Sequence, residues 1–253
     1  MTGMLASVTS VEEAQLVLKE GVDIVDLKNP EKGALGALDT NVVVEIVASV
    51  DRSILTSATV GDIEPDDPSL KNKITAMANT GVDFVKVGLF DSCVTNHFIQ
   101  VVNQVAGQGV KIIVVLFAEN ITNLSSLSSL SSLSELMKSD ISGVMLDTKN
   151  KSNGSLCSLL SNQELEEFVS TAKSNQLLTG LAGSLRIEDI ASLLDIEPDY
   201  LGFRGALCSG HDRVKSIDPK QIKKIRSAIP QREIIDFEEI DYTGEVLIDG
   251  SMA

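Results

Sequence analysis

Histidine and cysteine are scarce in this chain of 253 residues. The two histidines, His97 and His211, are too few for a histidine-rich metal site, and we expect neither a metal nor a cofactor. The three cysteines, Cys93, Cys157 and Cys208, are odd in number and widely spaced. This pattern predicts free thiols in a reducing cytoplasm rather than a disulfide framework.

Basic residues are also outnumbered, with 21 Lys and Arg against 36 Asp and Glu and a net charge of −15. Without an excess of positive charge, neither nucleic acid nor an anionic membrane is expected as a partner, and an anionic substrate would need a local basic pocket. No apolar run approaches the roughly 18 residues of a membrane span, and residues 1–7 lack the pattern of a signal peptide. We therefore expect a cytoplasmic protein, and further expect a homo-oligomer.

Short apolar runs alternate with helical patterns along the chain, without a Pro/Gly linker between domains. The expected strands are 4–8, 22–27, 53–60, 82–87, 111–117, 143–147, 177–182 and 200–203. The expected helices are 11–20, 40–50, 68–80, 94–106, 121–139, 162–175, 187–195 and 219–229. Ser10 with Glu13 and Ser161 with Glu164 have the spacing of a capping box at two helix starts.

About eight strand–helix units, apolar on both strand faces, predict a parallel sheet closed into a single (β/α)8 TIM barrel over residues 1–231. An acidic extension, residues 232–253, follows it. A doubly wound open sheet is the competing arrangement. It is less favoured because of the strand count and because no Gly-x-Gly-x-x-Gly motif opens the chain.

Charged residues stand where the even-numbered strands are expected to end. Asp26 and Lys28 share one face at the end of the second strand, while Lys86, Asp147 and Arg204 end the fourth, sixth and eighth. The carboxyl ends of barrel strands carry the active site, so these side chains are expected to converge. The alternative for each is an ordinary strand-end residue that reaches water.

Glycine-containing turns follow the seventh and eighth strands, at the usual phosphate-binding corner of such barrels. Gly183, Ser184, Arg204 and Gly205 are the candidate phosphate ligands, with backbone N–H groups and a helix N-terminus holding the anion. The alternative is a pair of tight turns that need glycine for backbone reasons. Two further hypotheses are a carboxylate role for Asp62 and, less favoured, a Cys208–His211 nucleophile pair.

Two lysines in one barrel mouth suggest covalent chemistry. Like charge and partial burial both lower a lysine pKa, so one neutral amine could attack a carbonyl and form a Schiff base. One of Lys28 and Lys86 would then be the nucleophile, and the other could move protons as a general acid or base. With a phosphate site on the opposite rim, the expected substrate is a small phosphorylated aldehyde or ketone, as in a class I aldolase.

Several long motifs resemble the (5-formylfuran-3-yl)methyl phosphate synthases, which make the furan precursor of the one-carbon carrier methanofuran. The segments are 23–36, 57–62, 84–89, 145–148, 181–186 and 202–213. The resemblance implies a carbon–oxygen lyase that condenses two molecules of glyceraldehyde 3-phosphate, with loss of one phosphate and two waters. It places the Schiff-base lysine on Lys28, the proton-acceptor lysine on Lys86, and further acidic and basic positions on Asp26, Asp147 and Lys151.

Three other functions remain open from the residues. Another class I aldolase or triose-phosphate lyase would use nearly the same side chains. An isomerase could use a carboxylate base without covalent chemistry, and a non-catalytic phosphate-binding barrel could serve as a binding or scaffold protein.

Overall fold

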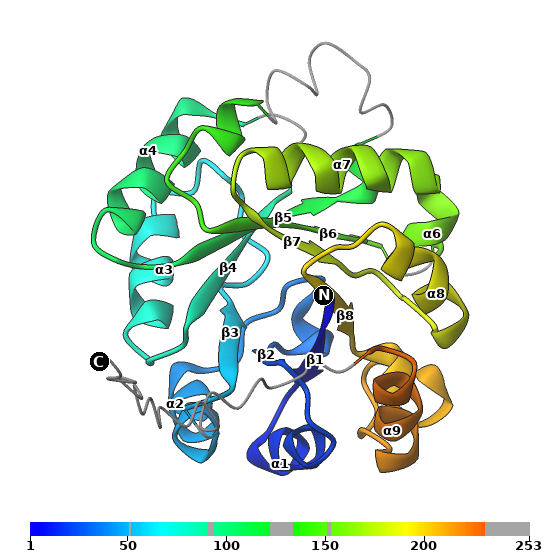
Figure 1. Ribbon diagram of the computed structural model, residues 1–253. Coiled ribbons are helices and arrows are strands. Elements are labelled where there is room, and N and C mark those ends of the chain that lie inside the picture. Colours follow the sequence, from blue (N-terminus) through cyan, green and yellow to red (C-terminus); the bar gives the residue numbers. More distant parts are fainter. Residues whose placement is uncertain (51, 91–93, 122–133, 151–152, 231–253) are drawn as a thin grey trace, which may run out of the picture.

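A computed structural model describes residues 1–50, 52–90, 94–121, 134–150 and 153–230. Within these residues the strands form one closed, all-parallel barrel in sequence order, with β1 also pairing with β8 (Figure 1). The strands are β1 (Gly3–Val8), β2 (Ile24–Leu27), β3 (Leu55–Thr59), β4 (Phe84–Leu89), β5 (Ile112–Phe117), β6 (Gly143–Asp147), β7 (Leu178–Leu181) and β8 (Tyr200–Phe203). The predicted (β/α)8 barrel is confirmed.

Helices surround the barrel on its outside (Figure 1). They are α1 (Val11–Lys19), α2 (Thr40–Ser49), α3 (Leu70–Ala78), α4 (Asn96–Ala106), α6 (Leu156–Leu159), α7 (Asn162–Ser174), α8 (Ile187–Asp195) and α9 (Pro219–Ser227). Short 3-10 turns lie at the carboxyl side of the strands: η1 (Pro30–Lys32), η2 (Ala118–Asn120), η4 (Gly205–Leu207) and η5 (Ser209–His211). The sequence did not predict α6. Most of the helix expected over 121–139, and the whole acidic extension, lie outside the described residues.

Two apolar cores hold the fold together, because residues of each strand alternate between the lumen and the helices. The inner core fills the barrel with side chains that include Leu5, Ile24, Val115, Phe117 and Met145. The larger outer core packs the other strand faces against the helices. A cavity lies at the carboxyl ends of the strands, where the polar side chains gather. A much smaller apolar cavity lies within the barrel, beside Leu5, Ile24 and Met145.

Aspartates brace the amino ends of three even-numbered strands, β2, β4 and β8. Asp23 precedes β2 and accepts a hydrogen bond from the backbone N–H of Met4 at 2.7 Å. Asp83 precedes β4 and accepts from the backbone and the hydroxyl of Thr56, and Asp199 does the same for Thr179 before β8. Asp23 and Asp83 each end a Gly-Val-Asp sequence, at residues 21–23 and 81–83, which therefore serves to pair neighbouring strands. These aspartates lie at the amino ends of β2 and β4, whereas Lys28 follows the carboxyl end of β2.

Lys86 differs in position from its prediction. It was expected to end the fourth strand, but β4 continues for three residues beyond it, to Leu89. Lys86 therefore projects from the middle of the strand and is only 2% exposed. The apolar run Val87-Gly-Leu extends the pairing with β5, which the strand pattern alone did not reveal.

Candidate active site

A buried carboxylate links four successive strands at the centre of the site. Asp26, the third residue of β2, has no exposed surface. Its Oδ1 accepts hydrogen bonds from Ser57 Oγ at 2.6 Å and Lys86 Nζ at 2.9 Å, and its Oδ2 accepts one from Ser7 Oγ at 2.8 Å. Sheet register makes this possible, since Ser7 and Ser57 lie beside Asp26 on the neighbouring strands. The two serines have no role in the sequence prediction, because only the closed sheet brings them to Asp26.

Asp26 is held in its ionised form. Burial is the largest influence on its pKa and acts to raise it. The charges of Lys86 and Lys28, with the hydrogen bonds from Ser57 and Lys86, outweigh burial and lower the pKa below its usual value. The carboxylate therefore accepts the hydrogen bond of Lys86 as an anion and fixes the position of this side chain in the site.

Lys28 and Asp147 form a second pair, nearer the mouth of the barrel. Lys28 directly follows β2, Asp147 ends β6, and Lys28 Nζ lies 3.8 Å from Asp147 Oδ2. Both residues are nearly buried, at 8% and 2% exposed. The other oxygen of Asp147 accepts the backbone N–H of Thr148 at 2.7 Å. The structure thus brings together Asp26, Lys86, Lys28 and Asp147, as expected, but as two carboxylate–lysine pairs.

Both lysines line one cavity at the carboxyl ends of the strands. Its volume is about 490 Å³, which is within the range of small-molecule sites. Lys28, Lys86 and Asp147 lie on its wall together with Gly183, Ser184 and Gly205 from the loops after β7 and β8. The lysines and the predicted phosphate corner therefore face the same space.

The loop after β7 has the backbone shape of an anion cradle. Gly183 has a φ of +110°, and a Cβ at this position would lie 2.9 Å from the backbone N of Thr148, so only glycine fits. Ser184 also has a positive φ, of 54°, which is uncommon for a residue with a side chain. Within the described residues, the N–H groups of Gly183, Ser184 and Gly205 donate to no protein acceptor. With the N-terminus of α8 nearby, these groups are available to a phosphate.

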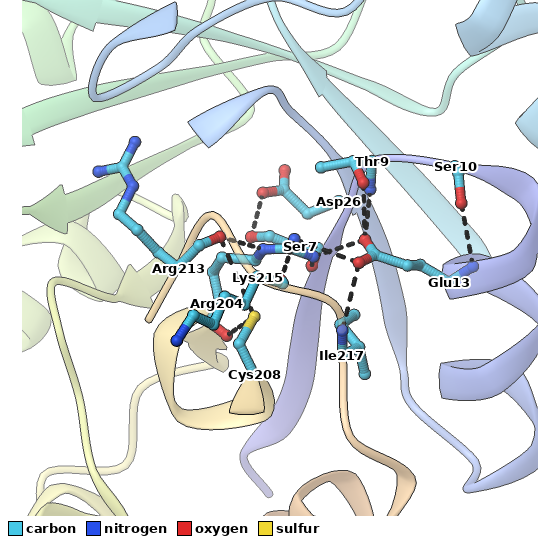
Figure 2. Close-up of polar contacts among 10 residues, drawn as sticks. All are labelled: Ser7, Thr9, Ser10, Glu13, Asp26, Arg204, Cys208, Arg213, Lys215 and Ile217. Atoms are coloured by element: carbon cyan, nitrogen blue, oxygen red, sulfur yellow. Dashed lines mark hydrogen bonds and ion pairs between the residues drawn. The ribbon is translucent and has the colours of Figure 1, made fainter. Parts of the chain in front are cut away.

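Arg204 lines the cavity, but its guanidinium is committed to the protein (Figure 2). Its Nε donates to Arg213 O at 2.9 Å and its Nη1 to Ser7 O at 3.2 Å. The remaining donors reach both carboxylate oxygens of Glu13 and the carbonyl of Lys215. All five side-chain N–H donors are thus used within the protein, so the guanidinium keeps none for a phosphate. The assignment of Arg204 to the phosphate corner stays a prediction from the sequence. The arginine positions the loop after β8 on β1.

Glu13 explains why Arg204 turns inward. The sequence predicts that Glu13 closes a capping box on Ser10, and the backbone N–H of Glu13 does donate to Ser10 Oγ. Its carboxylate, however, accepts hydrogen bonds from Thr9 and from Arg204 (Figure 2). The charge-assisted hydrogen bonds between Arg204 and Glu13 are stronger than the bond from a carboxylate to a neutral backbone N–H at the helix start. The carboxylate of Glu13 therefore pairs with Arg204 and does not close the capping box. The box at Ser161 is complete, since Glu164 both donates to Ser161 Oγ through its backbone N–H and accepts the backbone N–H of Ser161.

Arg213 is a cavity residue to which the sequence gave no role. It follows β8 in the chain, yet its Nη2 donates to the carbonyl of Pro30 at 2.6 Å and to that of Gly33, in the loop after β2. Burial, the largest influence, lowers its pKa, and the charges of Asp147 and Asp62 oppose that effect. No periodic pattern marks such a residue, because its partners are 180 or more positions away.

Two rim carboxylates act as loop clamps. The oxygens of Asp62 accept the backbone N–H groups of residues 34 and 35, at 3.0 and 2.7 Å. Glu119 accepts those of residues 149 and 150, at 2.9 and 2.8 Å. Asp62 therefore shapes the loop that follows Lys28, while its predicted carboxylate chemistry has no support in these contacts.

The Cys208 thiol is poorly suited to nucleophilic attack. It is fully buried, and its Sγ donates to Arg204 O at 3.2 Å. Burial is the main cause that raises its pKa to about 11, so the thiol stays protonated at neutral pH. The neighbouring His211 is exposed and bonds to Cys208 only through its own backbone N–H.

Lys151 lies outside the described residues, so its assignment stays a prediction from the sequence. In the described part of the chain, no group of three or more His, Cys, Asp or Glu side chains could hold a metal ion. Over the same residues, no helix has the length and apolar character to cross a membrane.

Comparison with known proteins identifies close relatives over most of the chain. The profile of the 4-HFC-P synthase family matches residues 4–226. A relative from Methylorubrum extorquens is 36% identical, over 89% of this chain and 91% of its own. The (5-formylfuran-3-yl)methyl phosphate synthase of Methanobrevibacter smithii is 34% identical, over 83% and 91%, and that of Methanopyrus kandleri 31%, over 89% and 98%.

Solved structures share the fold at low sequence identity. The phosphoribosyl anthranilate isomerase of Thermotoga maritima superposes with a TM-score of 0.66 at 15% identity, covering 90% of this chain and 98% of its own. A 3-hexulose-6-phosphate synthase gives a TM-score of 0.57 at 15% identity, over 90% and 100%. At these identities the likeness concerns the barrel alone.

Proposed function

This chain belongs to the 4-HFC-P synthase family, and on that premise we propose that it condenses two molecules of glyceraldehyde 3-phosphate into (5-formylfuran-3-yl)methyl phosphate. One phosphate and two waters are lost. The reaction proceeds through a Schiff base on Lys28, which makes the enzyme a lyase that supplies the furan of methanofuran.

One observation carries the proposal. A single cavity is lined by a lysine for imine formation, by a second lysine paired with a carboxylate, and by three backbone N–H groups suited to phosphate. A phosphorylated aldehyde held at Gly183, Ser184 and Gly205 would extend across this cavity toward the lysines. A barrel that only binds phosphate has no need of two buried lysines in the same space.

The product determines which carbons must join. One phosphate is kept on the carbon attached to ring carbon 3, and the formyl group stands on ring carbon 5. One triose thus supplies ring carbons 2 and 3, and the other supplies ring carbons 4 and 5. The new bond links C2 of the first triose to C3 of the second. The phosphate that leaves is therefore the one on C3 of the second triose.

Lys28 activates the first triose. Its neutral amine attacks the C1 aldehyde and loses water to form an imine, and proton loss from C2 gives an enamine whose C2 is nucleophilic. The second triose loses its C2 proton and its phosphate, which leaves an unsaturated aldehyde that accepts the enamine at C3. Its C2 hydroxyl then closes the ring on C1 of the first triose. Loss of the second water and of the Lys28 amine yields the aromatic furan.

Lys86 and Asp26 manage the protons of these steps. As an ammonium group held 2.9 Å from Asp26, Lys86 donates a proton to a departing oxygen. Once neutral, it accepts a proton from carbon in the next step. Asp147, 3.8 Å from Lys28 Nζ, orients the nucleophile and stabilises the iminium charge.

The decisive experiment supplies glyceraldehyde 3-phosphate and follows furan absorbance, released phosphate and product mass. Borohydride should trap a reduced triose phosphate on the peptide that contains Lys28. Lys28→Met should abolish both product and adduct. Lys86→Met should still form the adduct but make little furan, because the imine needs only Lys28.

Lys32→Met is the matched control, since Lys32 belongs to the same loop but its side chain is 54% exposed. It should keep normal turnover. A wild-type protein that makes neither furan nor phosphate would remove the proposed reaction, and full activity in Lys28→Met would remove the covalent route.

A further inference from the structure

Arg213 is a half-buried cation without a carboxylate partner. Among the described residues, no carboxylate oxygen lies within 4.0 Å of its guanidinium. The buried cations do have such partners: Lys28 with Asp147, Lys86 with Asp26, Arg204 with Glu13, and Arg226 with Asp23. Removing a charge from water is costly unless an opposite charge compensates it. In a chain with a net charge of −15, the exception is notable.

The guanidinium is held on one edge only. Nη2 donates to the carbonyls of Pro30 and Gly33, in the loop after Lys28. In the part of the chain that the structure describes, Nε and Nη1 donate to no protein acceptor. The carbonyls therefore orient the group while leaving donors for a planar, two-point contact, which is the way arginine binds phosphate.

The place of Arg213 differs from that of the backbone cradle. Its Cβ lies near Gly205, where a built Cβ would come within 3.9 Å, but its guanidinium is carried across to the loop after β2. It lines the same cavity as Lys28 and Lys86. The cavity thus has two separate positions suited to an anion, one at the Gly183–Ser184 turn and one against the Lys28 loop.

We propose that Arg213 forms a second phosphate subsite, which takes the phosphoryl group of the second triose and holds it as it leaves. This assignment of the leaving group rests on the proposed function; the subsite itself does not. Two substrates that each carry a phosphate need two anion positions. The backbone N–H groups of the Gly183–Ser184 turn supply one position, and Arg213 supplies the other. The positive charge stabilises the phosphate dianion as its bond to carbon breaks.

Inorganic phosphate is the probe, because its binding can be measured without turnover. Calorimetric titration of the wild-type protein should give two phosphates per chain. Arg213→Met should give one, or should weaken one of the two by about 10- to 100-fold, as loss of a charge-assisted contact does. Arg213→Lys should recover part of that affinity, because it keeps the charge without the fork.

Asp62→Ala is the matched control. It loosens the same loop, by removing the acceptor of residues 34 and 35, but keeps the arginine side chain and its charge. Both phosphates should still bind in it. Three results would each overturn the subsite. The wild type could bind only one phosphate, wild type and Arg213→Met could give equal titrations, or Asp62→Ala could lose as much phosphate affinity as Arg213→Met. If two phosphates bind but no furan forms, the proposed reaction fails while the subsite stands.

Discussion

Removing the ammonium group of Lys86 tests whether the buried ion pair is built as described. In Lys86→Met the side chain keeps its length, but Asp26, with no exposed surface, loses the partner at 2.9 Å. The hydroxyls of Ser7 and Ser57 and the more distant charge of Lys28 then stabilise the carboxylate. Breaking one half of a buried pair costs about 3–5 kcal/mol. For a barrel of this size that is a decrease in melting temperature of roughly 6–20 °C.

The assay is urea unfolding at pH 7, with the slope compared between proteins so that a change in midpoint reports stability. Asp26→Asn combined with Lys86→Met removes both charges and should recover most of the loss. Lys223→Met, at an exposed position on α9, is the control and should stay within about 0.5 kcal/mol of the wild type. The buried pair would be refuted if Lys86→Met were as stable as Lys223→Met. It would also be refuted if the double variant were no more stable than Lys86→Met.

The loss should depend on pH in a defined direction. In the wild type the pKa of Asp26 is lowered on folding, so its stabilisation is present above the ordinary pKa, near 4, and is lost as pH falls through the folded value. Without Lys86, burial is opposed only by the charge of Lys28 and the serine hydrogen bonds, so the pKa of Asp26 should be higher than in the wild type. The variant's carboxyl then takes up a proton at mildly acidic pH, so its deficit should be smaller at pH 5 than at pH 7. A deficit that grows toward pH 5 contradicts this.

Two further changes test the turn after β7 and the thiols. Gly183→Ala should destabilise the barrel by about 1–3 kcal/mol, because φ at this position is positive and the added Cβ would meet Thr148. It should also raise KM more than it lowers kcat. An unchanged melting temperature and KM would contradict a phosphate-binding role of this turn. In a Cys93→Ser background, Cys157 and Cys208 should react with a disulfide reagent at pH 8 about 100-fold more slowly than in urea, since burial raises both pKa values to about 11. Equal rates would contradict the burial of these thiols.

Much of the fold could be predicted because its signal is local. Eight short apolar runs between helical patterns predicted the closed parallel barrel, and the observed strand bounds differ by only a few residues. Lys28 was placed correctly past the end of β2. Lys86 was misplaced as a strand end, because the extra pairing of β4 with β5 depends on a neighbour that is distant in sequence.

The side-chain partners could not be predicted in the same way. Glu13 looked like half of a capping box, and Arg204 like a phosphate ligand, since each stood at the right local position. Folding brings these residues together from 191 positions apart, and their ion pair overrides both local roles. The homo-oligomer and the role of Lys151 stay predictions from the sequence.

The sequence by itself determined the barrel, the position of Lys28 just after β2 and the glycine turns after β7 and β8, because periodicity and backbone preference are properties of short segments. Tertiary structure alone decided which charged side chains pair. Asp26 forms its ion pair with Lys86, and Arg204 forms one with Glu13. Arg213 binds the carbonyl of Pro30 and keeps further N–H donors that face the cavity. Electrostatic pairing depends on distances of a few ångströms between side chains, and those distances exist only once the barrel has closed.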